Sequence, residues 1–196
     1  WDASNSRACQ LEFGNSCMSW ELPAGLGTRM AQPEGEVFVF IGDGAYLMNP
    51  MEILTSIQEG LKLTVVVSNN HGYQSIRLLQ MNRVGHSFGN EFRARDEETD
   101  LLEGDYLEID YAKNAESMGA RVWNVATPDE LGSALEEARE EARTCVIVAE
   151  VEKHRYTPDS GVWWDVEAAE VTEDATTRKL RADYEEARSN LQRFYY

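Results

Sequence analysis

A single acidic residue, Asp43, stands between two glycines directly after the apolar run at residues 37–41 (VFVFI). Asn70 and Gly72 follow a second such run, residues 64–68 (TVVVS). Glycine lets the backbone turn sharply and approach a ligand closely. A carboxylate, an amide oxygen and a carbonyl are ligands that suit Mg²⁺, which also takes phosphate oxygens. This chemistry predicts a Mg²⁺–diphosphate site, whereas an isolated Gly-Asp-Gly is more simply interpreted as a turn beside a polar strand cap.

The elements that must position these residues alternate between strands and helices. Continuous apolar runs predict buried strands at residues 37–41 and 64–68, and residues 121–126 and 145–151 are expected to form a third and a fourth strand. Helical spacing and capping residues predict helices that begin near Pro23, Asn49, Asp110 and Thr127, and a last helix with Leu180, Tyr184, Ala187 and Leu191 on one face. This alternation favours a doubly wound, mostly parallel α/β sheet flanked by helices, with ligands beyond the carboxyl ends of its strands.

We expect one α/β domain over residues 1–156 and an extension over residues 157–196, whose helix packs on that domain or on a partner chain. A chain of 196 residues provides one sizeable core. Residues 77–108 are charged and interrupted by glycines, which predicts a functional or mobile loop. The chain starts at Trp1 in a polar stretch, so we expect it to be part of a longer protein.

The composition limits the classes of function. A net charge of −17, with 35 acidic and 18 basic residues, repels polyanions and argues against nucleic-acid binding. The apolar runs are too short to span a bilayer, and no charged start followed by an apolar block indicates a signal peptide. The three cysteines and three histidines lack the spacing of a disulfide framework or a zinc site, which favours a reducing cytoplasm.

Asp43 and Asn70 are separated by one expected helix and one expected strand, and this arrangement resembles the GDG…NN signature of thiamine-diphosphate enzymes. The resemblance implies a doubly wound diphosphate-binding domain. It also implies that Asp43, the side-chain oxygen of Asn70 and the backbone carbonyl of Gly72 bind Mg²⁺. The residues that the resemblance places beside the cofactor are Ser16, Met18, Gly42, Asp43, Gly44, Ala45, Asn70, Gly72 and Tyr73.

Upstream, residues 17–27 (CMSWELPAGLG) are similar to the stretch that acetolactate synthases place before GDG. That similarity implies that Met18 wedges between the two cofactor rings, and that the backbone around Ser16 and Met18 hydrogen-bonds the aminopyrimidine. Met18 as simple core filler is the alternative. The sequence departs from the usual pattern of thiamine-diphosphate enzymes at two positions. Ala45 replaces a serine that touches the diphosphate in many relatives, and Ser19 replaces a usual glycine.

A closer resemblance covers nearly the whole chain and points to the C-terminal domain of trihydroxycyclohexane-dione hydrolases. The blocks that carry it are GDGAYL (42–47), QEGLK (58–62), NHGY (70–73), SFG (87–89), EFRAR (91–95), AKNAES (112–117), WWDV (163–166) and AEV (169–171). The family implies hydrolysis of a C–C bond in myo-inositol catabolism, which opens a cyclic 1,2-dione to a deoxy-glucuronic acid. Trp163 and Trp164 belong to a block that other thiamine enzymes do not share, and a role in packing alone is the alternative.

The family also implies that an activating glutamate lies on a separate N-terminal pyrimidine-binding domain of the same or a neighbouring chain. This split active site implies a homodimer or homotetramer. The sequence does not identify which residues of this chain take part in catalysis or contact the substrate. Arg77 stands where some decarboxylases carry a catalytic glutamate, which argues against a simple decarboxylase. The alternative is that Arg77, like His71 and Gln74, is an ordinary surface or loop residue. An acetolactate-synthase-like carboligase, a 2-oxo-acid decarboxylase and a non-catalytic cofactor-binding domain remain alternatives. A nicotinamide-binding domain is disfavoured, because no GxGxxG follows the first strand.

Overall fold

The computed structural model describes residues 8–12, 14–156 and 167–191, with side chains as far as residue 190. Trp163 and Trp164 lie outside these ranges. The chain divides into two compact units, Trp1–Tyr73 with Tyr106–Lys153, and Gln74–Asp105 with His154–Tyr196. Each unit is described by itself. The expected domain over residues 1–156 therefore stays a prediction, since residues 74–105 group with the C-terminal part of the chain.

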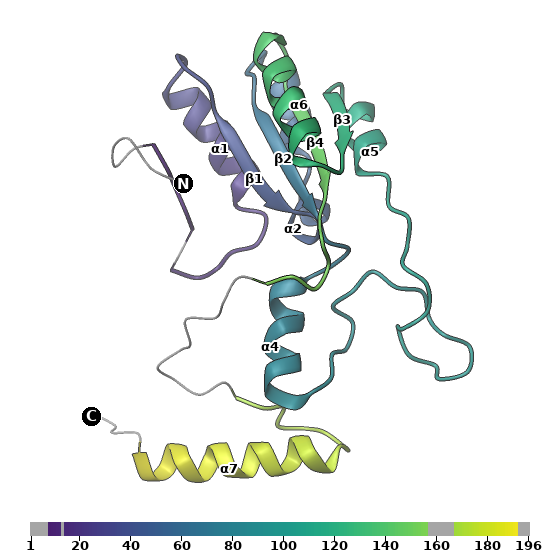
Figure 1. Ribbon diagram of the computed structural model, residues 1–196. Helices are drawn as coiled ribbons and strands as arrows, with labels where there is room; N and C mark the ends of the chain where they lie inside the picture. The colour runs from purple at the N-terminus through teal and green to yellow at the C-terminus, as the bar shows by residue number, and fades with distance from the viewer. Residues whose placement is uncertain (1–7, 13, 157–166, 192–196) are drawn as a thin grey trace. The chain divides into compact units, whose positions relative to one another are not determined.

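The first unit contains a four-stranded sheet in which all pairs are parallel. Its strands are β1 (Phe38–Gly42), β2 (Thr64–Asn69), β3 (Arg121–Val125) and β4 (Cys145–Glu150), in the order β1-β2-β4-β3. Parallel pairing brings the carboxyl ends of the strands to one edge (Figure 1). The expected parallel α/β sheet is confirmed, and the β-branched side chains of β2 are buried on both faces as their continuous run predicts.

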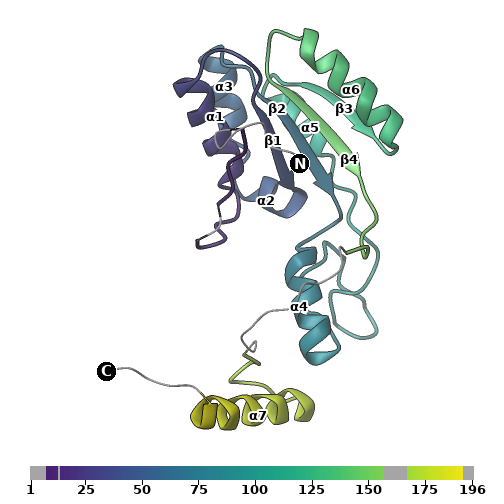
Figure 2. The same ribbon diagram turned by 60° about the vertical axis from the view of Figure 1, so that its left-hand side comes forward.

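Helices cover both faces of this sheet. They are α1 (Glu21–Ala31), α2 (Asp43–Met48), α3 (Glu52–Gln58), α5 (Tyr111–Ser117) and α6 (Pro128–Glu140). Val146 of β4 belongs to the core cluster that packs against α1, α2, α3 and α5, while its neighbour Ile147 belongs to the cluster beneath α6. Figure 2 shows α1 and α6 on opposite sides of the sheet. The alternation of side chains along a strand thus produces two apolar layers.

Two helix starts form as their capping residues predict. The Thr127 side chain accepts a hydrogen bond from the backbone of Glu130, whose carboxylate bonds back to the Thr127 amide, so α6 begins with a complete capping box. Asp110 accepts from the backbone of Lys113 at 2.9 Å and begins α5. Both caps replace hydrogen bonds that the first turn of a helix lacks.

Two expectations about helix starts are wrong. Asn49 does not cap the helix after the GDG motif, because α3 begins at Glu52 with Met51 at its N-cap and no side-chain cap bond. The sequence also predicts a turn at Asp43, with the next helix beginning later in the chain. Instead, a short helix, α2, begins at Asp43 itself. Tyr46 explains this helix, since its ring is fully buried and its hydroxyl donates to Asn114 at 2.8 Å.

The second unit contains α4 (Gln74–Val84) and α7 (Ala175–Leu191), which contact each other. The expected C-terminal helix is confirmed as α7. The expected loop over residues 77–108 is wrong in its first part, because α4 occupies it. Gln74 is buried at the start of α4 and accepts a hydrogen bond from the hydroxyl of Tyr156 at 3.2 Å. Within the described part of the chain, no helix is long and apolar enough to cross a membrane.

The contact of α1 with the sheet gives a first prediction. A Cβ atom on Gly25 would lie 2.4 Å from Cγ2 of Val39, while one on Gly27 would meet nothing within 4 Å. Gly25→Ala is therefore expected to lower the free energy of unfolding by about 1–3 kcal/mol through overpacking. Gly27→Ala, on the same helix, is expected to raise it by about 0.5–1 kcal/mol, because alanine favours the helix. Urea unfolding of both variants beside the parent protein measures the difference, and equal stability of the two would contradict this packing.

Candidate functional site

Asp43 lies at the carboxyl end of β1 and is fully buried. Its Oδ1 accepts a hydrogen bond from the Gly44 amide at 2.9 Å, and its Oδ2 accepts from the Gly72 amide at 3.0 Å. The hydroxyl of Tyr111 also donates to Oδ2, over 3.5 Å. Backbone amides therefore fix both carboxylate oxygens, and one of these amides comes from the loop after the neighbouring strand β2.

Asn70 completes a cluster with Asp43 and Gly72. One terminal atom of the Asn70 amide lies 2.9 Å from the carbonyl oxygen of Gly72 and 3.0 Å from Oδ1 of Asp43. When this atom is nitrogen, it donates a hydrogen bond to each of the two oxygens. A rotation of the amide by half a turn brings its oxygen to the same point, so three oxygens then converge. The prediction that these three residues lie together at the sheet edge agrees with this geometry.

The spacing of the three oxygen positions can be compared with that around a metal ion. Mg²⁺ holds oxygen ligands at about 2.0–2.1 Å in an octahedron, which places adjacent oxygens about 2.9 Å apart. The separations at Asn70, 2.9 and 3.0 Å, have this length. Oxygen donors of these types at these separations are compatible with a small hard cation, and the same separations equally suit hydrogen bonds from the Asn70 amide nitrogen. Among the described residues, no group of three or more His, Cys, Asp or Glu offers a metal site, and this cluster has only one carboxylate.

Burial also gives Asp43 an electrostatic reason to accept a cation. Desolvation raises the pKa of its carboxyl above the ordinary value, and the hydrogen bonds from the amides of Gly44 and Gly72 counteract only part of this effect. No described lysine or arginine forms an ion pair with Asp43. A buried carboxylate without an ionic partner is costly, and a bound cation would remove that cost.

The two glycines of the GDG motif have different surroundings. A Cβ atom on Gly44 would lie 2.6 Å from two ring carbons of Tyr73, whereas one on Gly42 would meet nothing within 4 Å. Gly44 is therefore required by the packing of the Tyr73 ring against the backbone. Because Gly42 has no side chain, the space beside Asp43 is open. A ligand that approaches the backbone closely requires such a space. Ala45 is buried in the hydrophobic core, so its side chain does not face this space.

The upstream residues that were expected near the cofactor lie in the loop before α1. Ser16 and Met18 are exposed, and Met18 has 42% of its surface accessible, so it is not core filler. Glu12 fixes this loop by accepting hydrogen bonds from the amides of Asn15 and Cys17 at 2.8 and 2.7 Å. No described hydrogen bond joins Ser16 or Met18 to Asp43.

Ser19, the residue that departs from the usual glycine, has an unusual environment. Its φ of 68° lies in the left-handed region, which favours glycine and explains why a glycine is usual there. Its hydroxyl is buried and has no hydrogen-bond partner among the described residues. A buried polar atom without a partner next to Met18 is consistent with a ligand at this loop.

The sequence predictions missed two groups near Asp43. Tyr111 is not among the residues predicted for the site, and the contact of its hydroxyl with Asp43 cannot be predicted from helical spacing. Asn69, His71 and Glu150 were not expected to interact, yet Glu150 accepts from the Asn69 amide and contacts the His71 ring, each at 2.7 Å. The pairing of β2 with β4 brings Glu150 opposite Asn69, and only the strand order could have indicated this.

Comparison with known proteins places the fold and the cluster in context. Residues 1–149 match the family described as "Thiamine pyrophosphate enzyme, C-terminal TPP binding domain". Asp43, Asn70 and Gly72 all lie within the matched range.

Two curated relatives are similar over almost the whole chain. The 3D-(3,5/4)-trihydroxycyclohexane-1,2-dione hydrolase of Geobacillus thermodenitrificans is 36% identical over 191 residues, which cover 97% of this chain and 29% of the relative. A second enzyme with this name, from Bacillus cereus, is 36% identical over 193 residues, which cover 98% of the chain and 30% of the relative. The chain thus spans less than a third of the length of these relatives.

Among solved structures, a thiamine diphosphate-dependent 4-hydroxybenzoylformate decarboxylase from Rhodococcus jostii superposes with a TM-score of 0.58. The match covers 69% of this chain and 23% of the decarboxylase, at 23% sequence identity. At this identity the likeness concerns the fold alone.

Proposed function

Since the chain belongs to the thiamine pyrophosphate enzymes, as a C-terminal TPP-binding domain, we propose that it holds thiamine diphosphate through Mg²⁺ bound to Asp43, Asn70 and Gly72. The observation that supports this most strongly is the meeting of the Asn70 amide, the Gly72 carbonyl and the Asp43 carboxylate at separations of 2.9 and 3.0 Å. In this proposal the Asn70 amide turns by half a rotation when the metal binds. Its nitrogen satisfies the two oxygens in the free protein, and its oxygen becomes a ligand in the loaded one.

The remaining residues of the site position the cofactor. Gly42 leaves space for the diphosphate, and the Tyr73 ring closes over Gly44. The backbone of Ser16 and Met18 holds the aminopyrimidine, and the Met18 side chain separates the two cofactor rings. Thiamine diphosphate itself supplies a carbon nucleophile and an electron sink. The backbone of Ala45 remains beside the diphosphate, although its buried methyl group provides no hydrogen bond in place of the hydroxyl that serine carries in many relatives.

We further propose that the full-length protein opens trihydroxycyclohexane-1,2-dione by hydrolysis of a C–C bond. Support comes from relatives that carry this name and match 97–98% of the chain. The proposal includes a second, N-terminal domain that supplies the activating glutamate, from the same or a neighbouring chain of a homodimer or homotetramer. A cytoplasmic location agrees with Cys9, Cys17 and Cys145, all of which are free. The isolated chain is expected to bind the cofactor weakly and to be inactive, because half of the active-site cleft is absent.

An assay of the full-length protein tests this function. Consumption of the cyclic dione is measured with and without Mg²⁺ and thiamine diphosphate, and pyruvate serves as the alternative substrate. The proposal predicts cofactor-dependent loss of the dione with no action on pyruvate. Acetolactate or CO₂ from pyruvate would instead assign the protein to the carboligases or decarboxylases. Ring opening by residues 1–196 alone would show that no second domain is needed.

The buried carboxyl of Asp43 predicts a pH dependence of cofactor binding. In the metal-free protein its pKa is raised above the ordinary value of about 4. Because the Asp43 pKa is higher in the folded than in the unfolded protein, its protonated form stabilises the fold at low pH. This contribution to the free energy of unfolding is lost as the pH rises through the folded-state pKa of Asp43. Mg²⁺ requires the ionised form, so its affinity is expected to fall as the pH drops from 8 toward this raised pKa. Calorimetric Mg²⁺ titrations from pH 8 down to pH 4 measure this, and an affinity independent of pH over that range would contradict a role for Asp43.

A further inference from the structure

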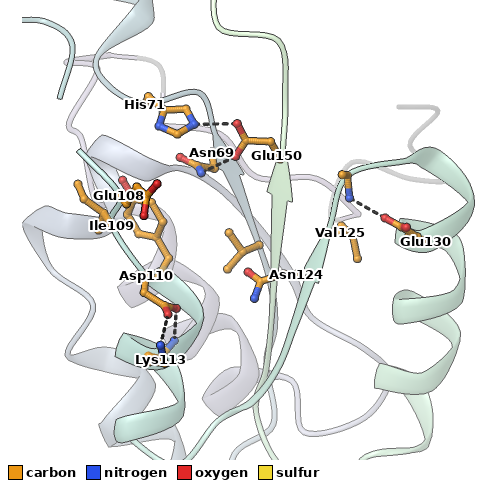
Figure 3. Close-up of a pocket in the computed structure, with 13 residues that line it drawn as sticks. Asn69, His71, Glu108, Ile109, Asp110, Lys113, Asn124, Val125, Glu130 and Glu150 are labelled. Atoms are coloured by element: carbon orange, nitrogen blue, oxygen red, sulfur yellow. Dashed lines mark hydrogen bonds and ion pairs between the residues drawn. The ribbon is translucent and has the colours of Figure 1, made fainter. Parts of the chain in front are cut away.

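The carboxylate of Glu150 bonds to two residues of the loop that carries Asn70 and Gly72, and we call residues 69–72 the metal loop. Oε2 of Glu150 accepts from the side-chain nitrogen of Asn69, and Oε1 contacts Nε2 of His71, each at 2.7 Å. Figure 3 shows both side chains beside this carboxylate, at the end of β4. One side chain of the neighbouring strand therefore holds the residues on both sides of Asn70.

The metal loop is held from two directions. Its Gly72 amide donates to Asp43 at 3.0 Å, and the Asn70 amide lies 2.9 Å from the Gly72 oxygen and 3.0 Å from Asp43. Asn69 and His71 are held by Glu150 instead. The two proposed ligands and the two residues bonded to Glu150 thus alternate along the sequence. A movement of either bonded residue would displace the ligand next to it.

Glu150 is a firm support because the sheet fixes its backbone. It pairs with Asn69 in the parallel ladder between β2 and β4, and the Val151 amide donates to the Asn69 carbonyl at 3.1 Å. A side chain on a regular strand is placed more precisely than one on a loop. The side chain of Glu150 is 46% exposed, so its truncation leaves no cavity in the apolar core.

The backbone of His71 depends on such a support. Its φ of 60° lies in the left-handed region, which is rare for a residue other than glycine. The ring contacts Glu150 and also the edge of the Tyr106 ring, with 5.4 Å between ring centroids. Residues in this region keep their conformation only where the surroundings determine it. Because His71 turns the chain between Asn70 and Gly72, loss of its partner is expected to loosen both ligands.

A simple surface ion pair is the alternative interpretation of Glu150, since Nζ of Lys153 lies 3.8 Å from its Oε1. An exposed pair of this kind acts through charge and contributes little. The bonds to Asn69 and His71 instead depend on the position of two atoms. Glutamine separates the two interpretations, because its oxygen can accept from Asn69 while its NH₂ donates to the unprotonated Nε2 of a neutral His71.

We propose that Glu150 is a positioning residue of the cofactor site, which holds the metal loop in the conformation that binds Mg²⁺. The inference rests on the proposed function, because it takes Asn70 and Gly72 as metal ligands. With the backbone fixed on both sides, the Asn70 amide can turn toward the metal without a movement of Gly72. Glu150 itself contacts neither the metal nor the cofactor and acts through Asn69 and His71.

Calorimetric titration of the full-length protein with Mg²⁺, at saturating thiamine diphosphate, tests the inference. Glu150→Ala is expected to weaken Mg²⁺ binding about tenfold, as loss of a residue that supports metal ligands predicts. Glu150→Gln, which can keep both hydrogen bonds without the charge, is expected to bind Mg²⁺ like the parent protein. Glu136→Ala, on the exposed side of α6, is the matched control and should also bind like the parent.

A second measurement needs no metal. Hydrogen–deuterium exchange of the metal-free protein, followed by mass spectrometry of peptides that cover residues 69–73, reports the amide of Gly72, which donates to Asp43. We expect faster exchange in Glu150→Ala and the parent rate in Glu150→Gln, because the loop opens only when both bonds are lost. His71→Asn is a further variant, since asparagine tolerates the left-handed backbone but is too short to reach Glu150. Mg²⁺ binding is expected to weaken less in this variant than in Glu150→Ala, because the bond from Asn69 remains.

Parent-like Mg²⁺ affinity in Glu150→Ala, or a Glu150→Gln variant as weak as Glu150→Ala, would overturn the positioning role. If Glu150→Ala does not fold, parent-like affinity in His71→Asn would overturn it as well. Faster exchange in Glu150→Ala, together with cofactor binding that is independent of Mg²⁺ in the parent protein, would retain the role of Glu150 in the loop and reject the proposed metal site. Mg²⁺-dependent binding that Glu150→Ala leaves unchanged would do the reverse.

Discussion

Asp43→Asn is expected to lower the affinity of the full-length protein for Mg²⁺–thiamine diphosphate by about 100-fold or more, because the variant removes the one carboxylate of the site. The asparagine keeps the size of the side chain, but both oxygens of Asp43 accept hydrogen bonds from backbone amides. One of these amides would therefore face an NH₂ group. We expect a loss of stability of about 1–3 kcal/mol for this mismatch, so the variant is examined by circular dichroism before binding is measured.

Fluorescence or calorimetric titration with thiamine diphosphate, at saturating Mg²⁺ and again in EDTA, measures the effect. Asp129→Asn makes the same chemical change at an exposed position in the first turn of α6 and is expected to bind like the parent protein. A folded Asp43→Asn variant whose affinity remains within a few-fold of the parent would reject Asp43 as the metal ligand. Affinity that does not depend on Mg²⁺ in the parent protein would reject the metal itself.

Gly44→Ala is expected to disrupt the metal site by displacing Tyr73 and the loop that carries Gly72. The new methyl group would lie 2.6 Å from the ring of Tyr73, so the ring and the loop that carries Gly72 must move. Overpacking of this kind costs about 1–3 kcal/mol of stability. Because the Gly72 amide and carbonyl both belong to the displaced loop, we also expect cofactor affinity to fall about tenfold or more.

Gly42→Ala is the matched control for Gly44→Ala. Its methyl group would meet no atom within 4 Å, and its φ of −73° suits alanine, so the metal-free protein should keep its stability. If the diphosphate approaches the backbone at Gly42, cofactor affinity falls in this variant without any loss of stability. Equal stability of the two variants would contradict the packing of Tyr73 on Gly44, and unchanged cofactor affinity in both would place the diphosphate elsewhere.

Most of the sheet could be predicted from the sequence. Residues 64–67 (TVVV) are a continuous β-branched run, and such a run is typical of a strand that is buried on both faces. Asp43 and Asn70 follow two neighbouring parallel strands, so their meeting at one edge follows from topology. The caps at Asp110 and Thr127 are local interactions within one turn of chain, which is why residue type and spacing alone predict them.

Other parts of the structure depend on tertiary contacts that spacing does not encode. Helix α4 was expected to be a loop, since its apolar residues Ile76 and Leu79 are about half exposed and give no clear amphipathic pattern. Helix α2 contains Gly44, a poor helix former, and is held by burial of Tyr46 in the core. The bonds of Glu150 to Asn69 and His71 join residues far apart in the sequence and require the β2–β4 pairing.

The central claim is that Asp43, Asn70 and Gly72 bind the metal ion, and the position of that ion in a crystal tests it most directly. Crystals of the full-length protein grown with thiamine diphosphate and Mn²⁺, which accepts the same oxygen ligands as Mg²⁺, would reveal the ion by anomalous diffraction. The account predicts one strong peak within about 2.3 Å of Asp43 Oδ1, the Asn70 side-chain oxygen and the Gly72 carbonyl oxygen, with the Asn70 amide turned accordingly. A peak bound to none of these three oxygens, beside an ordered diphosphate, would contradict it.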